Sequence, residues 1–190
     1  MEKRDIPIRT CLLALVLIVM TAGLAEFALG RRLWGVGGIP GFWSGDIWSS
    51  HNSQFLTDPY TFTHISHGIL FYGAVTVLFP TLPLRKRLIV AVGVEAAWEV
   101  LENTSYVINR YRMETISLNY FGDSIVNSMA DTLACVVGFL LASRLHKAVT
   151  IAVFAGLEFA LLLWTRDNLV LNILMLFYSS NAIRTWQRGG

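Results

Sequence analysis

The fold is decided by the stretch RLIVAVGVEAAWEVLEN, residues 87–103, which is apolar over most of its length yet contains three glutamates. A second stretch, residues 121–142, reads FGDSIVNSMADTLACVVGFLLA and has the same mixed character. Each is long enough to cross a bilayer as a helix. One carboxylate at the centre of a membrane costs about 2.5–3.5 kcal/mol on insertion scales. Five acids in two such segments therefore predict a functional site inside a membrane protein.

The acids of both stretches recur at helical spacing. On an α-helix, the glutamates of the first stretch fall within about 60° of one another, and the polar residues of the second fall within about 80°. The first stripe consists of Glu95, Glu99 and Glu102, and the second consists of Asp123, Asn127 and Asp131. Each helix is therefore expected to turn one polar face toward its neighbours.

Composition places the chain among multi-pass membrane proteins. Of its 190 residues, 54% are hydrophobic and only 15% are charged, whereas soluble domains average about 25% charged residues. We expect a single all-α domain, residues 1–190, forming a membrane helical bundle. Cys11 and Cys135 lie in apolar segments and are expected to be free thiols. The basic residues form no nucleic-acid patch, so the expected partner is membrane lipid, and the oligomeric state is left open.

Six membrane-spanning helices are expected. Hydropathy places them at residues 10–29, 60–82, 88–106, 121–143, 148–164 and 168–183. Residues 30–59 contain three tryptophans and few charges, which is typical of a loop at the membrane interface. A cleaved signal peptide is the alternative for the first span, because Gly23-Leu24-Ala25 precedes Glu26 in a small-x-small pattern.

Lysine and arginine predict the orientation. With the N-terminus inside, the inner segments hold ten of these residues and the outer segments hold five. The positive-inside rule favours this assignment, so both termini are expected in the cytoplasm and the aromatic loop outside. His64 and His67 then lie in the first two turns of the second span, on one face of their helix. The polar residues of three spans should converge on one outward-facing cavity.

Three interpretations of this polar group stay open. His64, His67 and Glu102 make a usable ligand set for a divalent metal, with Glu99 as the other acid that could take this part. Alternatively, Glu99, Glu102, Asp123, Asn127 and Asp131 carry acid–base chemistry or position a substrate. The third interpretation is a polar network that only locks the bundle together.

Three segments carry a family resemblance. They are Asp58-Pro-Tyr-Thr-Phe-Thr-His64-Ile-Ser-His67-Gly68, Trp98-Glu99-x-x-Glu102-Asn103 and Gly122-Asp123-Ser-Ile-x-Asn127-Ser-x-Ala-Asp131. Together they resemble an uncharacterised family of inner-membrane proteins from Gram-negative bacteria, catalogued as of unknown function, over essentially the whole chain. The resemblance implies a multi-pass protein of the bacterial inner membrane and brings no activity with it.

Three classes of function fit these observations. The leading hypothesis is a membrane-embedded hydrolase or transferase acting on a lipid or lipid-linked envelope substrate. A proton-coupled transporter is the second, because Glu95 and Asp131 are expected near the middle of the membrane, where carriers bind their substrates. The third is a non-catalytic scaffold for envelope assembly. The sequence names neither the substrate nor the metal.

Overall fold

The computed structural model describes residues 5–117 and 119–189. Over these residues the fold is entirely helical and has no strand, which confirms the all-α class. The α-helices are α1 (Ile8–Ala28), α2 (Thr61–Leu78), α3 (Leu84–Glu102), α4 (Ser105–Glu114), α5 (Ile125–Arg144), α6 (Lys147–Thr165), α7 (Leu169–Phe177) and α8 (Asn181–Gln187), and a 3-10 turn, η1, covers Val36–Gly38.

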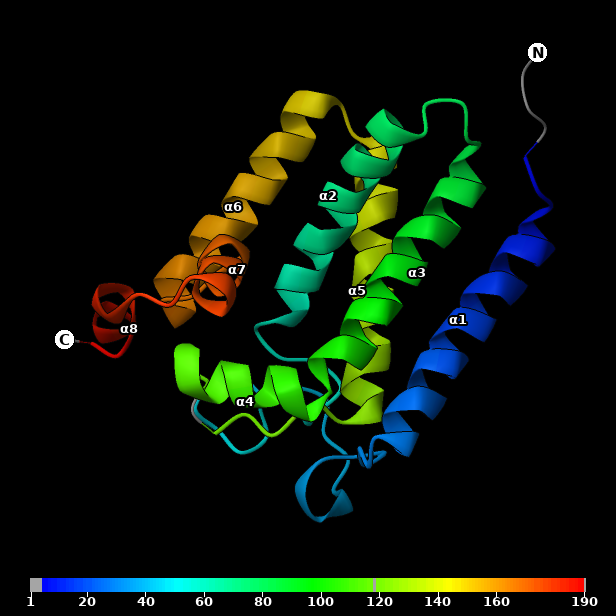
Figure 1. The fold of residues 1–190 in the computed structure, drawn as a ribbon. Helices are drawn as coiled ribbons and strands as arrows, with labels where there is room; N and C mark the ends of the chain where they lie inside the picture. Colours follow the sequence, from blue (N-terminus) through cyan, green and yellow to red (C-terminus); the bar gives the residue numbers. More distant parts are fainter. Residues whose placement is uncertain (1–4, 118, 190) are drawn as a thin grey trace.

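The five long helices α1, α2, α3, α5 and α6 stand side by side (Figure 1). The closest approach is between α2 and α5, where glycines face the opposite backbone. A Cβ atom at Gly68 would lie 2.0 Å from the Cys135 carbonyl oxygen, and one at Gly138 would lie 2.0 Å from the Ile65 carbonyl oxygen. Small residues allow this contact, which is how helices pack tightly inside membranes.

The three helices that are long and apolar enough to cross a membrane, among the residues described, are α1, α5 and α6. Helices α2 and α3 are of similar length and lie between them, but they carry the histidines and glutamates of the polar stripes. The structure thus supports three of the six expected spans by length and composition.

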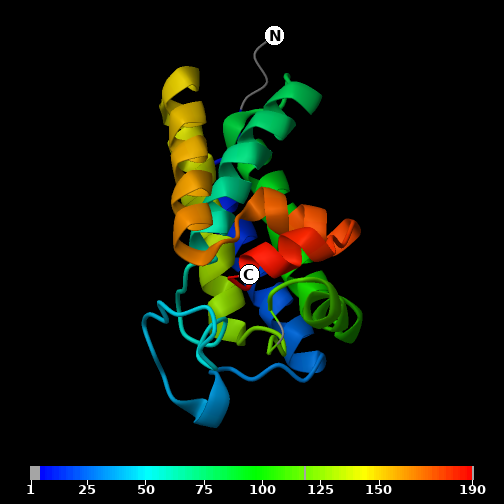
Figure 2. The ribbon, with the colours of Figure 1, turned by 90° about the vertical axis from the view of Figure 1, so that its left-hand side faces the viewer.

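The sixth expected span, residues 168–183, is not one continuous helix. Helix α7 ends at Phe177, and Ser180 begins α8 by accepting a hydrogen bond from the Ile183 amide. A nine-residue helix rises about 14 Å, less than half of the roughly 30 Å hydrocarbon core. Figure 2 shows α7 and α8 lying across the bundle rather than along it. The turn residues Tyr178-Ser179-Ser180 are the physical reason for the break.

This break changes the arrangement of the chain ends. Five upright helices place the start of α1 at one end of the bundle and α7 and α8 toward the other (Figure 1). The six-span prediction put both ends of the chain on the same side. The difference follows from α7 and α8, which stay near the end where α6 finishes.

The loop of residues 30–59 is folded against the start of α5. The carbonyls of Arg32 and Leu33 accept hydrogen bonds from the Ile125 and Val126 amides, at 2.9 and 3.2 Å. The first amides of a helix have no partner within the helix itself. The loop therefore supplies acceptors to α5 and is held in place beneath the polar face of the bundle.

Candidate functional site

A layer of polar side chains is buried where α2, α3 and α5 meet. Each is less than a tenth exposed, which is rare for acids unless they are paired or functional. The members of this layer are His64, Glu95, Glu99, Asn103, Asp123, Asn127 and Asp131. The three helices therefore turn their polar stripes toward one another.

His64 lies at the centre of this layer. Its Nδ1 atom is 2.6 Å from Glu95 Oε1 and 3.2 Å from Glu99 Oε1. Its Nε2 atom is 3.8 Å from Asp131 Oδ2. One imidazole thus contacts acids from two helices, α3 and α5.

His67 lies one helical turn away and shares the Glu95 carboxylate. Its Nδ1 atom is 3.0 Å from Glu95 Oε2, and the centroids of the two imidazole rings are 5.1 Å apart. Side chains three or four positions apart share one face of a helix. This spacing explains why α2 presents both rings together and why Glu95 and Glu99 meet them from α3.

Glu102 lines the cavity but is not in the group of side chains close enough together to hold a metal ion. The side chains that could hold a metal ion, within the described part of the chain, are His64, His67 and Glu95. Glu102 is only half-buried and lies seven residues further along α3, in the wall of the neighbouring cavity. The acid closest to the histidines is therefore Glu95, which the sequence analysis had placed near mid-membrane.

Asp123 belongs to a second group of hydrogen-bonded side chains. Its Oδ2 atom accepts hydrogen bonds from Asn103 Nδ2 at 2.9 Å and from the Tyr120 hydroxyl at 2.8 Å. Its own amide donates to Asn103 Oδ1 at 2.8 Å. Asn127 is also buried, and its backbone N–H donates to Oγ of Ser124, the residue that precedes α5. These contacts tie α3 to the start of α5.

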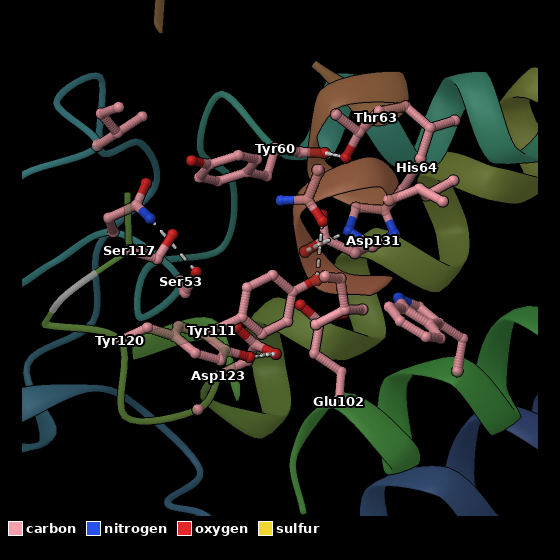
Figure 3. A pocket seen from close by; sticks show the side chains of 18 of the residues that line it. Ser53, Tyr60, Thr63, His64, Glu102, Tyr111, Ser117, Tyr120, Asp123 and Asp131 are labelled. Atoms are coloured by element: carbon pink, nitrogen blue, oxygen red, sulfur yellow. Dashed lines mark hydrogen bonds and ion pairs between the residues drawn. The ribbon is translucent and has the colours of Figure 1, made fainter. Parts of the chain in front are cut away.

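A cavity of about 330 Å³ opens beside the polar layer. Figure 3 shows His64 and Asp131 at one side of it, Glu102 and Tyr111 below them, and Asp123 next to Tyr120. Side chains from the loop of residues 30–59, from α2, α3 and α4, and from α7 complete the wall. Of the five predicted acids and amide, Glu102, Asp123 and Asp131 thus line the cavity, whereas Glu99 and Asn127 are buried and do not line it.

The cavity has an apolar side as well. Leu70 and Phe71 of α2, Val94 of α3 and Ile173 of α7 line it. Leu70 is 44% and Val94 is 49% exposed, so this side reaches the outer surface of the bundle. The cavity therefore joins a polar interior to an apolar surface.

Asp167 does not line the cavity but is bonded to two residues that do, Tyr60 and Asn172. It is 2% exposed and its carboxylate accepts hydrogen bonds from Tyr60, Asn172 and Gln187, at 3.2–3.4 Å. Burial raises the pKa of Asp167 to about 6, although these hydrogen bonds lower it. Tyr111 continues the chain of contacts, because its hydroxyl donates to Asn172 Oδ1 at 3.0 Å.

Sequence reasoning missed Asp167 and Tyr60, which donates a hydrogen bond to it. Asp167 follows a left-handed residue, Arg166, in the tight turn after α6. In the sequence, such a turn shows no sign of function and is interpreted as a connection between two helices. Only the folding of α7 back against α4 brings this turn to the cavity.

Comparison with known proteins identifies relatives along the whole chain. Residues 26–189 match the model of a protein family described as "Protein of unknown function (DUF2585)". A UPF0314 protein of Rhizobium meliloti is 48% identical over 178 residues, covering 94% of this chain and 90% of the relative. The chain belongs to this family. A UPF0314 protein of Brucella anthropi is 49% identical over 147 residues, covering 77% of this chain and 74% of the relative.

A third UPF0314 protein, from Sphingopyxis alaskensis, is 42% identical over 179 residues, covering 94% of this chain and 95% of the relative. No solved structure matches the chain. The resemblance drawn from the three sequence segments to an uncharacterised family of Gram-negative bacteria is therefore confirmed. The family description carries no activity, so the function has to be argued from the cavity.

Proposed function

We propose that this UPF0314 protein is an enzyme of the bacterial inner membrane that hydrolyses or transfers the head group of a lipid or lipid-linked envelope substrate. The observation that carries the proposal is the two-sided cavity. Buried histidines and acids line one side, and apolar side chains that reach the bundle surface line the other. A lipid has the same division between a polar head group and apolar chains.

The proposed topology has five spans, α1, α2, α3, α5 and α6. Beside the short turns at the end where α1 begins, the helix ends carry Arg85, Lys86 and Arg87 of α3, Arg144 of α5 and Lys147 of α6. Over the whole chain, eight lysines and arginines then lie on that side and seven on the other. The positive-inside rule counts lysines and arginines in short loops and near helix ends. We therefore assign these turns to the cytoplasm.

This topology places the cavity and α8 on the outer side of the membrane. A reporter that is active only outside the cytoplasm tests it. Fused after Gln187 the reporter should be active, and fused after Arg144 it should be inactive. Activity after Arg144, or its absence after Gln187, would contradict the five-span arrangement.

The proposed chemistry uses the carboxylates that face the cavity. In hydrolysis, a water molecule attacks the phosphorus or carbonyl atom of the head-group linkage and the bond to the leaving oxygen breaks. One carboxylate takes the proton of the water, and a second, protonated carboxyl group donates a proton to the leaving oxygen. Glu102 and Asp131 line the cavity from opposite helices and fit these two roles. In a transferase, an acceptor hydroxyl replaces the water.

Lipid analysis of a deletion strain tests the proposal. We expect the strain to accumulate a lipid with an unprocessed head group, wild-type protein to reverse this, and Glu102→Gln to fail at normal membrane abundance. Asp46→Asn is the matched control, because it removes one acidic charge from an exposed loop position. Unchanged lipids together with altered solute uptake would overturn the enzyme hypothesis and favour the transporter hypothesis.

A further inference from the structure

We propose that His64, His67 and Glu95 bind a divalent transition-metal ion, with zinc as the ion that the ligand set fits best. One ligand atom from each residue lies within 4.8 Å of the other two. Two histidines and one glutamate form the zinc set of several hydrolytic enzymes, in which a fourth position stays open for water or substrate. The metal site itself does not depend on the lipid chemistry proposed above; only its catalytic use does.

The distances between the donor atoms suit one ion. At zinc–ligand distances near 2.0–2.1 Å, two ligand atoms of a tetrahedral site lie about 3.3 Å apart. His67 Nδ1 is 3.0 Å from Glu95 Oε2, and His64 Nδ1 is 2.6 Å from Glu95 Oε1. Small rotations of these side chains would therefore open room for the ion.

Two buried carboxylate oxygens next to the cluster accept no hydrogen bond from the residues described. They are Glu99 Oε1 and Asp131 Oδ1. Leaving a buried charged acceptor without a donor is costly. Glu99 Oε1 is 3.2 Å from His64 Nδ1, so it borders the site and would add negative charge next to the ion.

Asp131 fits the role of an orienting group. If His64 binds the ion through Nδ1, its Nε2–H faces Asp131 Oδ2, which is 3.8 Å away. Histidine ligands commonly donate their second ring N–H to a carboxylate, which fixes the ring and strengthens the ligand. The structure thus supplies both the ligands and the group behind one of them.

The negative charge of the buried polar layer favours the binding of a cation. Glu95, Glu99 and Asp131 surround two imidazoles, and all three acids are at most 3% exposed. Buried acids in membrane helices need a counter-charge. A divalent ion would provide it and would be reachable, because both histidines line the cavity.

The test is the metal content of purified full-length protein, loaded with zinc, manganese, iron or cobalt in turn and freed of excess ion. We expect about one zinc per chain, and a visible absorption band for the cobalt-loaded protein, as a site with these ligands requires. His64→Ala, His67→Ala and Glu95→Gln should each lower zinc affinity by at least about tenfold.

Two matched variants serve as controls. His146→Ala removes an exposed histidine at the start of α6, and Glu26→Gln removes the charge of a fully buried acid on α1. Both should keep the zinc. Circular dichroism and size exclusion establish that each variant is folded, and His67→Gln replaces His67→Ala where folding fails.

Two results would overturn the metal site. One is folded wild-type protein that binds none of the four ions. The other is zinc binding that survives in all three ligand variants. Because no lipid is involved in the measurement, a failure of the proposed lipid chemistry leaves this result unaffected.

Discussion

The acids around His64 differ from Asp123, at the start of α5, in whether their buried oxygens accept hydrogen bonds. Asp123 accepts two hydrogen bonds on one oxygen, from Asn103 and Tyr120. Glu99 and Asp131 each keep an oxygen that accepts none from the described chain. Buried polar groups are normally paired, and those that are not call for a ligand or a function. From this comparison we assign Asp123 a structural role and assign Glu99 and Asp131, next to His64, a chemical role.

The largest expected effect is on function, at Glu99. Glu99→Gln keeps the shape of the side chain and removes its charge next to His64. We expect lipid processing per folded molecule to fall about hundredfold, as when a group supporting a metal ligand is lost, with the melting temperature unchanged. Quantitative lipid analysis and thermal unfolding of the same preparations measure both. A large fall in melting temperature would place Glu99 with Asp123 instead.

The next effect is on stability, at Asn103. Asn103→Ala removes both hydrogen bonds that this side chain makes to Asp123 and leaves a buried carboxylate short of a donor. We expect the free energy of unfolding to drop by about 3 kcal/mol. Asn109→Ala, on an exposed face of α4, is the control and should cost little. Equal melting temperatures for the two variants would show that the Asp123 network does not hold the fold.

A smaller effect is expected at the contact between α2 and α5. Gly138→Ala would place a Cβ atom against the Ile65 carbonyl and push the histidine-bearing helix away. Overpacking of this kind costs about 1–3 kcal/mol. Gly73→Ala is the control, since nothing lies within 4 Å of its added Cβ. Equal unfolding temperatures for the two variants would contradict the close packing.

The smallest effect is local and depends on pH. The pKa of Asp167 rises from 3.8 to about 6 on folding, so the folded state binds its proton more tightly than the unfolded state does. Docking of α7 and α8 should therefore weaken as pH rises from about 4 to about 6. Hydrogen exchange of these two helices, corrected for its intrinsic pH dependence, should show this in wild-type protein. Asp167→Asn should remove the slope.

Local periodicity in the sequence predicted part of this structure. The all-helical class and the polar stripes on α2, α3 and α5 depend only on composition and on spacings of three and four residues. The gathering of His64, Glu99 and Asp131 follows from those stripes once the three helices lie side by side.

The remaining features depend on contacts between distant segments. The acid nearest to the histidines is Glu95, and this depends on how far α2 and α3 are shifted along each other, which local spacing does not predict. The sixth expected span is not one helix, because the apolar stretch of residues 168–183 is broken after Phe177. Asp167 carries no motif, and its position depends on that break.

The measurement that tests the central claim most directly compares Asp131→Asn with Asp123→Asn. Both remove one buried charge and keep the size of the side chain. Each variant is expressed in the deletion strain, and its lipid processing is measured together with its membrane abundance. The account predicts that Asp131→Asn fails to restore processing at normal abundance and that Asp123→Asn restores it. Restoration by both variants, or failure of both at normal abundance, would contradict the distinction between the two groups of acids.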